Sequence, residues 1–247
     1  MWGSSPGFFR IQSQFVSPDR LMVFVPGFCL SSSMVRQYEY QPCLPTRGTE
    51  VPAGPDFFHE IKHDGFRLIV HREGKRVRLF TRRGYDWSNR YPLITQAALR
   101  FRKRAFVIDG EAVVLGPDGI SDFDALYGGR RNDEAMLVLY AFDLLSDDGV
   151  DMRDQTLQIR KLWLSRLLKR SADGIIQNDH HYDAGAIGPL LFRQACLMGL
   201  EGIVSKHRDS SYKAGPSKRW IKVKNPNSPA MRRAKEIGWR TARRNSR

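Results

Sequence analysis

One lysine and a group of basic residues far downstream could carry out covalent chemistry in this chain. Lys62 stands in the sequence Lys-His-Asp-Gly, and Lys222 and Lys224 stand in Trp-Ile-Lys-Val-Lys. A lysine ammonium has a pKa of about 10.4, so it is a nucleophile at neutral pH only where its surroundings stabilise the free amine. Cations gathered around one phosphate would lower this pKa and neutralise charge on a transferred phosphoryl group. The pattern predicts that Lys62 attacks a phosphorus atom, with Arg67, Lys222 and Lys224 as its neighbours.

Four further short motifs lie between these two segments. In chain order they are Leu79-Phe80-Thr81-Arg82-Arg83-Gly84, Ile108-Asp109-Gly110-Glu111, Tyr140-Ala141-Phe142-Asp143-Leu144-Leu145 and Glu201-Gly202-Ile203-Val204-Ser205-Lys206. The six motifs resemble those of the covalent nucleotidyltransferases, which comprise ATP-dependent DNA ligases, RNA ligases and mRNA capping enzymes. Six ordered matches are far more specific than any one of them. The resemblance covers residues 42–225, and within the superfamily the chain is most similar to bacterial ATP-dependent DNA ligases of the end-joining kind.

The resemblance implies a reaction in three steps. Lys62 would attack the α-phosphate of ATP and release pyrophosphate, AMP would pass to a DNA 5′-phosphate at a nick or break, and the neighbouring 3′-hydroxyl would displace AMP. The resemblance also implies which residues bind the nucleotide. These are Glu60, Arg67, Arg82, Phe142, Ile203, Lys222 and Lys224.

The base of the nucleotide would be recognised by aromatic, aliphatic and acidic side chains. By resemblance, Phe142 stacks on one face of adenine, and Ile203 or Val204 covers the other face. Glu60, two residues before the nucleophile, resembles the position that reads the adenine amino group. ATP is therefore the expected nucleotide.

Two glutamates at the margins of apolar, strand-like runs are the predicted metal-associated residues. Glu111 follows the run 106–108, and Glu201 precedes the run 202–204. Mg²⁺ prefers hard oxygen ligands, commonly one or two carboxylates together with phosphate oxygens and water. By resemblance, Glu111 and Glu201 hold Mg²⁺ (or Mn²⁺), while Asp109 is interpreted as structural.

Positive charge is concentrated in two segments. Residues 60–111 carry thirteen basic and six acidic side chains, a net of +7, and residues 202–247 carry fourteen and two, a net of +12, within a chain of net charge +14. This distribution is typical of proteins that bind a phosphate backbone. Arg83 stands where the family has a small polar residue, which leaves open whether it or Arg82 reaches the nucleotide ribose or the DNA 5′-phosphate. The predicted DNA contacts are Arg82, Arg83, Lys206, Lys218 and Arg219.

Each motif also has an interpretation without chemistry. A lysine before Asp-Gly is more often an exposed turn residue, and Phe142 alone would be an ordinary core residue. An RNA ligase, a GTP-using capping-type transferase and a non-catalytic nucleic-acid-binding remnant are the alternatives. His180 and His181 are not a metal pair by spacing, since adjacent residues on a strand point apart. The other histidines of the motif region, His63, His71 and His207, are interpreted as bystanders.

Hydrophobic periodicity predicts strands and helices in alternation. The expected strands are Phe57 to Lys62, Phe66 to Arg72, Val77 to Thr81, Phe106 to Leu115, Met136 to Leu145, Gly174 to Gln177, Gly202 to Lys206 and Trp220 to Lys224, and the expected helices are Leu93 to Arg102, Leu157 to Lys169 and Gly188 to Met198. The resemblance implies an α/β (α+β) architecture, the two-sheet ATP-grasp-like nucleotidyltransferase fold, with the nucleotide in a groove between the sheets. Lys62 would lie in a tight connection between two strands. There Gly65 would let the backbone turn closely around a nucleotide, and Asp64 would fix the turn through local hydrogen bonds.

Length and composition predict one soluble domain of moderate size with flanking segments. The 247 residues are 41% hydrophobic, with no apolar run long enough to span a bilayer. Three widely separated cysteines favour a reducing cytoplasm over a disulfide framework. We expect a monomer of the bacterial cytoplasm without membrane association, which acts on nicked or broken DNA beside other end-joining repair proteins.

The chain is expected to fall into three parts. Residues 1–40 would be an extension that is disordered or translated from a start upstream of Met34, residues 41–225 the adenylation domain, and residues 226–247 a basic tail. A tail of 22 residues cannot hold the oligonucleotide-binding domain that follows in complete ligases. Since self-adenylation uses that domain, we expect it to be retained less well than the sealing of pre-adenylated nicks.

Overall fold

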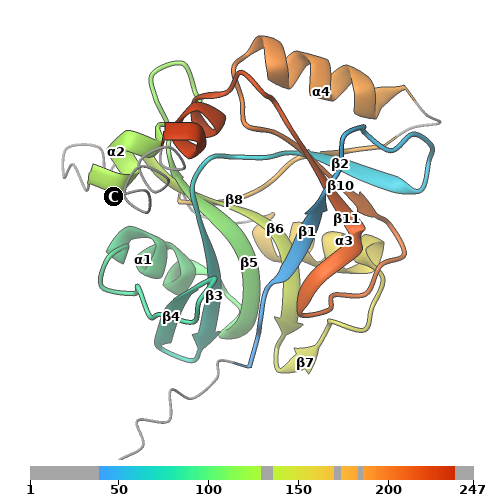
Figure 1. The fold of residues 1–247 in the computed structure, drawn as a ribbon. Coiled ribbons are helices and arrows are strands. Elements are labelled where there is room, and N and C mark those ends of the chain that lie inside the picture. The colour runs from blue at the N-terminus through green and yellow to red at the C-terminus, as the bar shows by residue number, and fades with distance from the viewer. Residues whose placement is uncertain (1–38, 129–135, 170–173, 183–185, 237–247) are drawn as a thin grey trace, which may run out of the picture. The chain divides into compact units, whose positions relative to one another are not determined.

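Two β-sheets form the framework in the computed structural model, which describes residues 39–128, 136–169, 174–182 and 186–236 (Figure 1). The first sheet has the order β1 (Cys43–Arg47), β11 (Gly215–Lys224), β10 (Gly202–His207), β2 (Phe57–Ile61) and β9 (His180–His181). The second has the order β4 (Arg76–Thr81), β3 (Phe66–Glu73), β5 (Ala105–Val114), β6 (Leu137–Asp147) and β7 (Val150–Asp151), with β8 (Ile175–Gln177) parallel to β6. The predicted two-sheet α/β architecture is confirmed.

The chain crosses from the first sheet to the second directly after β2. Residues 62–65 connect β2, which pairs with β10, to β3, which pairs with β4 and β5. A Cβ atom on Gly65 would lie 2.2 Å from the carbonyl oxygen of Ala112 and 2.8 Å from the side chain of Val113. The glycine is therefore required by close packing of the connection against β5. Gly65 also lines the pocket described below, so the predicted close turn around a nucleotide stays a prediction beside this packing requirement.

Side chains of β3 alternate between two apolar clusters. Leu68 and Val70 pack in a cluster that includes side chains of the helix after β4. Ile69 belongs to a second cluster, which includes Phe58 of the first sheet and Trp220 of β11. This alternation follows from the two-residue period of a strand. The second cluster joins the two sheets and so supports the space between them.

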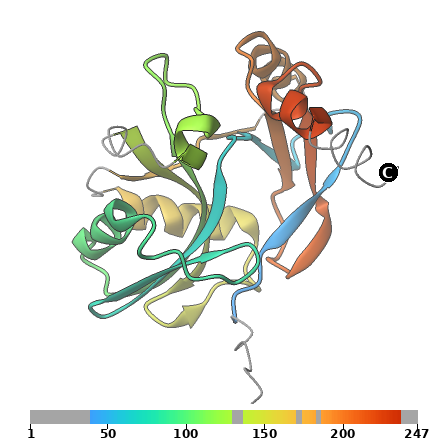
Figure 2. The same cartoon turned by 60° about the vertical axis from the view of Figure 1, so that its left-hand side comes forward.

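Four labelled helices accompany the sheets (Figure 2). They are α1 (Pro92–Arg100), α2 (Phe123–Gly128), α3 (Leu157–Leu168) and α4 (Ile187–Leu197), and residues 229–236 are also helical. Helix α3 packs on β6, and α4 packs on β10 and β2. At the start of α3 the hydroxyl of Thr156 accepts a hydrogen bond from the amide of Ile159, which is a helix cap. Within the described part of the chain, no helix has the length and apolar character needed to cross a bilayer.

The predicted strands and helices are all present, with ends shifted by a few residues. The prediction missed β1, β7, β9, α2, the first half of β11 and the helix 229–236. Pro45 explains the omission of β1, and Pro216 that of the first half of β11, since a proline has no amide hydrogen to donate within a sheet. The register of β1 with β11 shifts directly after Pro45. Residues 1–38 of the predicted extension 1–40, most of the polar loop predicted near Gly128, and residues 237–247 lie outside the described residues.

Candidate active site

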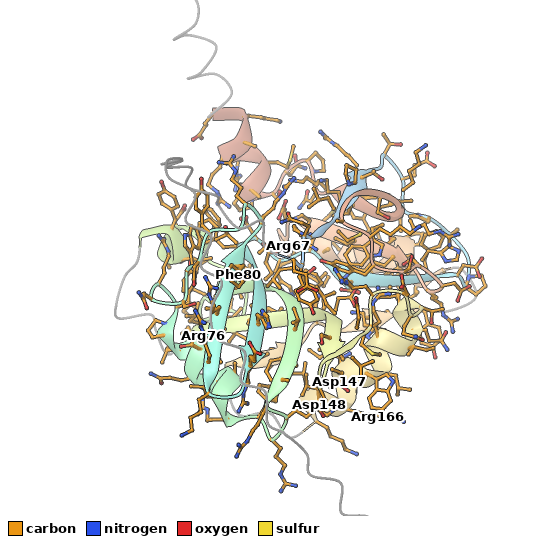
Figure 3. The ribbon with its side chains drawn as sticks, turned by 90° about the horizontal axis from the view of Figure 1, so that it is seen from below. Arg67, Arg76, Phe80, Asp147, Asp148 and Arg166 are labelled. Carbon is orange, nitrogen blue, oxygen red and sulfur yellow. The ribbon has the colours of Figure 1, made fainter. Side chains whose placement is uncertain are left out.

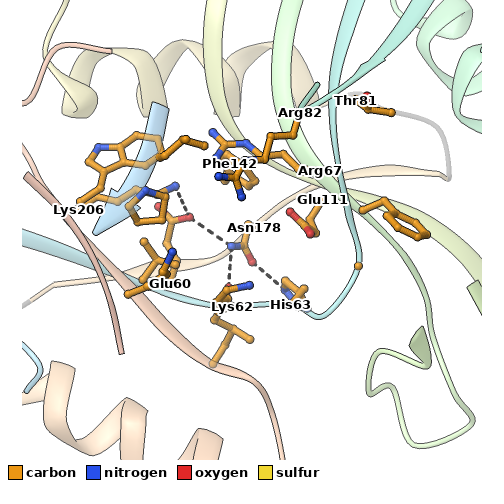
Figure 4. A pocket seen from close by; sticks show the side chains of 18 of the residues that line it. Glu60, Lys62, His63, Arg67, Thr81, Arg82, Glu111, Phe142, Asn178 and Lys206 are labelled. Atoms are coloured by element: carbon orange, nitrogen blue, oxygen red, sulfur yellow. Dashed lines mark hydrogen bonds and ion pairs between the residues drawn. The ribbon is translucent and has the colours of Figure 1, made fainter. Parts of the chain in front are cut away.

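A pocket of about 910 Å³ lies between the sheets, beside the connection from β2 to β3 (Figure 4). Its volume is in the range of roughly 300 to 1,000 Å³ that is common for small-molecule sites. Both sheets contribute charged and aromatic side chains to its wall. They include Glu60, Lys62, Val204, Lys206, Trp220 and Lys222 from the side of the first sheet, and Arg67, Glu111 and Phe142 from the second.

Lys62 is fixed at the start of the crossing connection. Its amide donates a hydrogen bond to the carbonyl of Gly202, and its Nζ lies 2.6 Å from Oε2 of Glu201. Burial lowers the pKa of this ammonium, but the charges of Glu201 and Glu111 outweigh burial, and the pKa of Lys62 is raised. In the protein without nucleotide the carboxylates therefore dominate, and the lowering predicted for cations gathered around a bound phosphate stays a prediction.

The cations predicted around Lys62 are nevertheless close to it. Lys222 lines the pocket, and its pKa is lowered by burial and then by the charges of Lys224, Lys62 and Arg82. Lys224 lies 2.7 Å from Oε1 of Glu201, so this one carboxylate bridges Lys62 and Lys224. The site therefore contains three lysines close together, two of which form ion pairs with the same carboxylate, Glu201.

Glu111 and Glu201 both lie close to Lys62, Glu111 in the pocket wall and Glu201 in direct contact with the ammonium. Burial raises the pKa of Glu111 to about 7, and the charge of Glu201 adds to this rise while Lys62 and Arg67 oppose it. Burial would raise the pKa of Glu201 too, but Lys62 and Lys224 lower it. A divalent cation fits this donor set, because a buried carboxylate pair supplies hard oxygen ligands and gains from compensating charge. The described residues contain no cluster of three or more metal-ligating side chains, so other ligands would come from substrate phosphates or water.

Arg67 lies between the two sheets (Figure 3) and is held by Asp109. Its Nε lies 2.9 Å from one oxygen of the Asp109 carboxylate, and Tyr212 donates a hydrogen bond of 2.6 Å to the other oxygen. Asp109 is fully buried. The structural role predicted for Asp109 is confirmed, and Arg67 reaches the pocket wall in an orientation fixed by this carboxylate.

The residues predicted to cover the two faces of the base belong to β6 and β10. Phe142 lines the pocket, with the guanidinium of Arg67 5.2 Å from its ring centre. Val204 also lines the pocket, whereas Ile203 is fully buried and does not. The choice of Ile203 is therefore wrong. Neighbouring residues on a strand point to opposite faces, and Val204 shares its face with Lys206, which also lines the pocket.

Glu60 sits in a buried network of cations and amides (Figure 4). Its two oxygens lie 2.7 Å from Lys161 Nζ and 2.8 Å from Lys206 Nζ, and Asn178 donates a further bond of 3.2 Å. The two lysines outweigh the effect of burial and lower the pKa of Glu60. Burial lowers the pKa of Lys206 to about 8. Lys206 is 3% exposed, so it does not present its charge to DNA, and the predicted DNA contact at this residue is wrong.

Three pocket-associated residues were missed by the sequence analysis, and one was misinterpreted. Lys161 and Asn178 lie outside the motifs, so only three-dimensional proximity reveals them. Trp220 lies within a motif, and the ammonium of Lys206 is 4.3 Å from its ring. His63, interpreted as a bystander, lines the pocket, stacks on Tyr140 with ring centres 3.8 Å apart and bonds to Asn178.

The remaining predicted DNA contacts lie at the surface. Arg82 and Arg83 line the pocket and are exposed, and Lys218 and Arg219 are exposed on β11. All four side chains are exposed and cationic, as contact with a phosphate backbone requires. Asp64 differs from its predicted role, because its carboxylate forms an ion pair with Arg233, far along the chain.

The two-sheet fold, with a lysine in the crossing connection and two acids beside it, defines a nucleotidyltransferase domain. A family model described as "ATP dependent DNA ligase domain" matches residues 48–224. The chain therefore belongs to the ATP-dependent DNA ligase family and covers its adenylation domain.

Individual relatives agree with this assignment. The chain is 36% identical over 178 residues to the multifunctional non-homologous end joining protein LigD of Pseudomonas aeruginosa, covering 71% of this chain and 21% of that protein. It is 35% identical over 177 residues to a DNA ligase of Pyrobaculum calidifontis, covering 67% of this chain and 30% of the relative. A structure of mycobacterial DNA ligase D complexed with ATP and MES matches with a TM-score of 0.65 and 29% identity, over 74% of this chain and 60% of the other. The predicted similarity to bacterial end-joining ligases is confirmed.

Proposed function

We propose that this chain attaches AMP from ATP to Lys62, passes the AMP to a DNA 5′-phosphate and seals a nick or break. One observation carries the proposal. Lys62 lies in a single pocket with Glu111 and Lys222, and its ammonium contacts Glu201, so a nucleophile stands beside acids and cations suited to phosphoryl transfer.

The other end of the pocket suits adenine better than guanine. Glu60 can accept a hydrogen bond from the adenine amino group, and the ammonium of Lys206, 2.8 Å from it, can donate to the neighbouring ring nitrogen. Guanine presents the reverse pattern at these two atoms. Phe142 and Val204 supply apolar surface for the faces of the base. This arrangement supports ATP and disfavours the GTP-using capping-type alternative.

Residues of this chain then have separate tasks in the transfer. The Lys62 amine would form the P–N bond while the bond from the α-phosphorus to the pyrophosphate oxygen breaks. Lys222 and Lys224 would offset charge on the phosphates. Mg²⁺ or Mn²⁺ held by Glu111 and Glu201 would compensate the two negative charges that raise the pKa of Lys62 and would polarise the phosphate.

The DNA end would approach along the exposed basic residues. Arg82 and Arg83 at the pocket wall, with Lys218 and Arg219 on β11, would contact the phosphate backbone. The similarity to a protein named for non-homologous end joining supports a place in repair of broken DNA. By the same similarity, other end-joining repair proteins are the proposed partners; the chain spans 21% of that relative.

The direct test incubates the purified protein with α-labelled ATP or GTP and Mg²⁺, followed by denaturation. We expect label from ATP that survives denaturation, and sealing of nicked DNA that already carries AMP. Label from GTP in preference to ATP would indicate a capping-type transferase. Rapid labelling with no sealing of pre-adenylated nicks, but with sealing of RNA, would indicate an RNA ligase.

A further inference from the structure

The segment that follows β11 is anchored to the body of the domain, although the sequence predicts a basic tail. Asn225 is 1% exposed, and its side chain donates a hydrogen bond of 3.1 Å to the carbonyl of Leu200. Ser228 is fully buried, and its hydroxyl donates to the carbonyl of Asn225. Pro229 stands in the first turn of the helix 229–236, a favourable position for proline. The start of this helix is therefore fixed beside β10.

The other contact of this helix is with the connection that carries Lys62. Arg233 forms an ion pair with the carboxylate of Asp64, two residues after the nucleophile. The Arg233 guanidinium also lies 4.6 Å from the ring centre of Phe123, at the start of α2 (Figure 1). The side chains of Arg233 and Asp64 are 27% and 21% exposed. A partly buried arginine that is both paired and stacked is held in one orientation better than an exposed ion pair.

The connection from Lys62 to Gly65 is held on three sides. At its start the Lys62 amide bonds to Gly202, and at its end Gly65 packs against Ala112. Between these points, Asp64 forms an ion pair with Arg233. Within the described part of the chain, Asp64 has no other ion pair. Since an attacking atom must lie about 3 to 3.5 Å from the phosphorus, a small shift of this connection would slow the reaction strongly.

We propose that Arg233 is a positioning residue for the nucleophile, which acts by holding Asp64 and with it the backbone of Lys62. This inference rests on the proposed function, and it makes the helix 229–236 part of the structure that supports the candidate active site. Arg233 itself is assigned no contact with the nucleotide. Its loss should reduce the rate of AMP attachment at saturating ATP and leave the ATP concentration for half-saturation nearly unchanged.

The test compares Arg233→Ala and Asp64→Asn with Arg232→Ala, a matched control on the exposed side of the same helix. We expect hydrogen exchange of the backbone amides of residues 62–66 to become faster in Arg233→Ala and Asp64→Asn but not in Arg232→Ala. Single-turnover labelling with ATP should be about ten- to a hundredfold slower in the same two variants. The double variant should resemble each single one, because both remove the same pair. Arg233→Lys should restore part of the rate, since it keeps the charge but loses the planar guanidinium.

Two results would overturn the inference. One is unchanged exchange at residues 62–66 in Arg233→Ala, and the other is an equal effect of Arg232→Ala. The exchange measurement needs no turnover. If the unmodified protein formed no lysine-linked AMP, the proposed function would fail, while the exchange result would still decide the role of Arg233.

Discussion

The ammonium of Lys62 and the carboxylate of Glu201 lie 2.6 Å apart, and this contact opposes the chemistry proposed for the lysine. The carboxylate raises the pKa of the amine that has to lose a proton. The same carboxylate is well placed to hold a divalent cation. These two effects of Glu201 can be measured separately. Its effect on the pKa of Lys62 is present without ATP, whereas its proposed metal binding matters for the reaction with ATP.

Replacing Glu201 with Gln should therefore have opposite effects on two measurements. Without nucleotide or metal, an amine-selective reagent at pH 8 should modify Lys62 roughly tenfold faster, which corresponds to a pKa lower by about one unit. Labelling with ATP and Mg²⁺ should fall strongly, because the variant holds the metal less well. Peptide mapping after modification measures the first effect. Slower or unchanged modification of Lys62 would show that Glu201 does not control its pKa.

Base recognition can be tested at Lys206. Lys206→Met leaves Glu60 paired with Lys161 and removes the donor proposed for the adenine ring nitrogen. A hydrogen bond to a charged group contributes about 1.5 to 3 kcal/mol, so half-saturation with ATP should require roughly ten- to a hundredfold more nucleotide. The preference for ATP over GTP should shrink. The control Lys218→Met, exposed on the neighbouring strand, should change neither value. A full ATP preference in Lys206→Met would remove this residue from base recognition.

DNA binding should depend on the exposed basic residues and on salt. We expect Lys218→Ala with Arg219→Ala to weaken binding to nicked duplex and to reduce the slope of log affinity against log salt by about 0.9 for each phosphate that the variant no longer neutralises. Titrations at several salt concentrations measure this slope. Lys75→Ala, exposed in the turn between β3 and β4, is the control. An equal slope in the double variant and the unmodified protein would place the DNA-binding surface elsewhere.

Acid stability should report on two partly buried histidines. Burial lowers the pKa of His63 and of His180 to about 4 from an ordinary value of 6.5. Between pH 6.5 and 4 the unfolded chain binds protons that the folded chain does not, so the free energy of unfolding should fall as the pH drops through this window. Each of His63→Gln and His180→Gln should reduce that loss by about 1 to 2 kcal/mol.

Denaturant unfolding at pH 7, 5.5 and 4.5 provides the measurement. His181→Gln, at an exposed position of β9, serves as the control. A pH profile that is the same in all three variants would contradict the effect of burial.

The ordered motifs allowed much of the site to be predicted, because their spacing along the chain is maintained by the fold. Lys62, Glu111 and Phe142 all line one pocket as expected. The choice between Ile203 and Val204 could also have been made, since strand parity places Val204 on the face of Lys206. That parity is visible in the sequence.

Other features depend on contacts between distant residues. The pairing of Glu60 with Lys161 joins β2 to α3, and the pairing of Asp64 with Arg233 joins the crossing connection to the helix after β11. Local periodicity carries no signal for either pair. The raised pKa of Lys62 likewise arises from carboxylates that are distant in the sequence, Glu201 and Glu111. These electrostatic relationships therefore required the structure.

The central claim is that Lys62 becomes linked to AMP. The most direct measurement incubates the unmodified protein and Lys62→Ala with α-labelled ATP and Mg²⁺, denatures both and locates the label by peptide mapping. We predict label on the peptide that contains Lys62 and none in Lys62→Ala. Lys62→Arg should also remain unlabelled, because a guanidinium with a pKa above roughly 12 stays protonated. Label at the unmodified level in Lys62→Ala, or label on another residue, would contradict the assignment of Lys62 as the nucleophile.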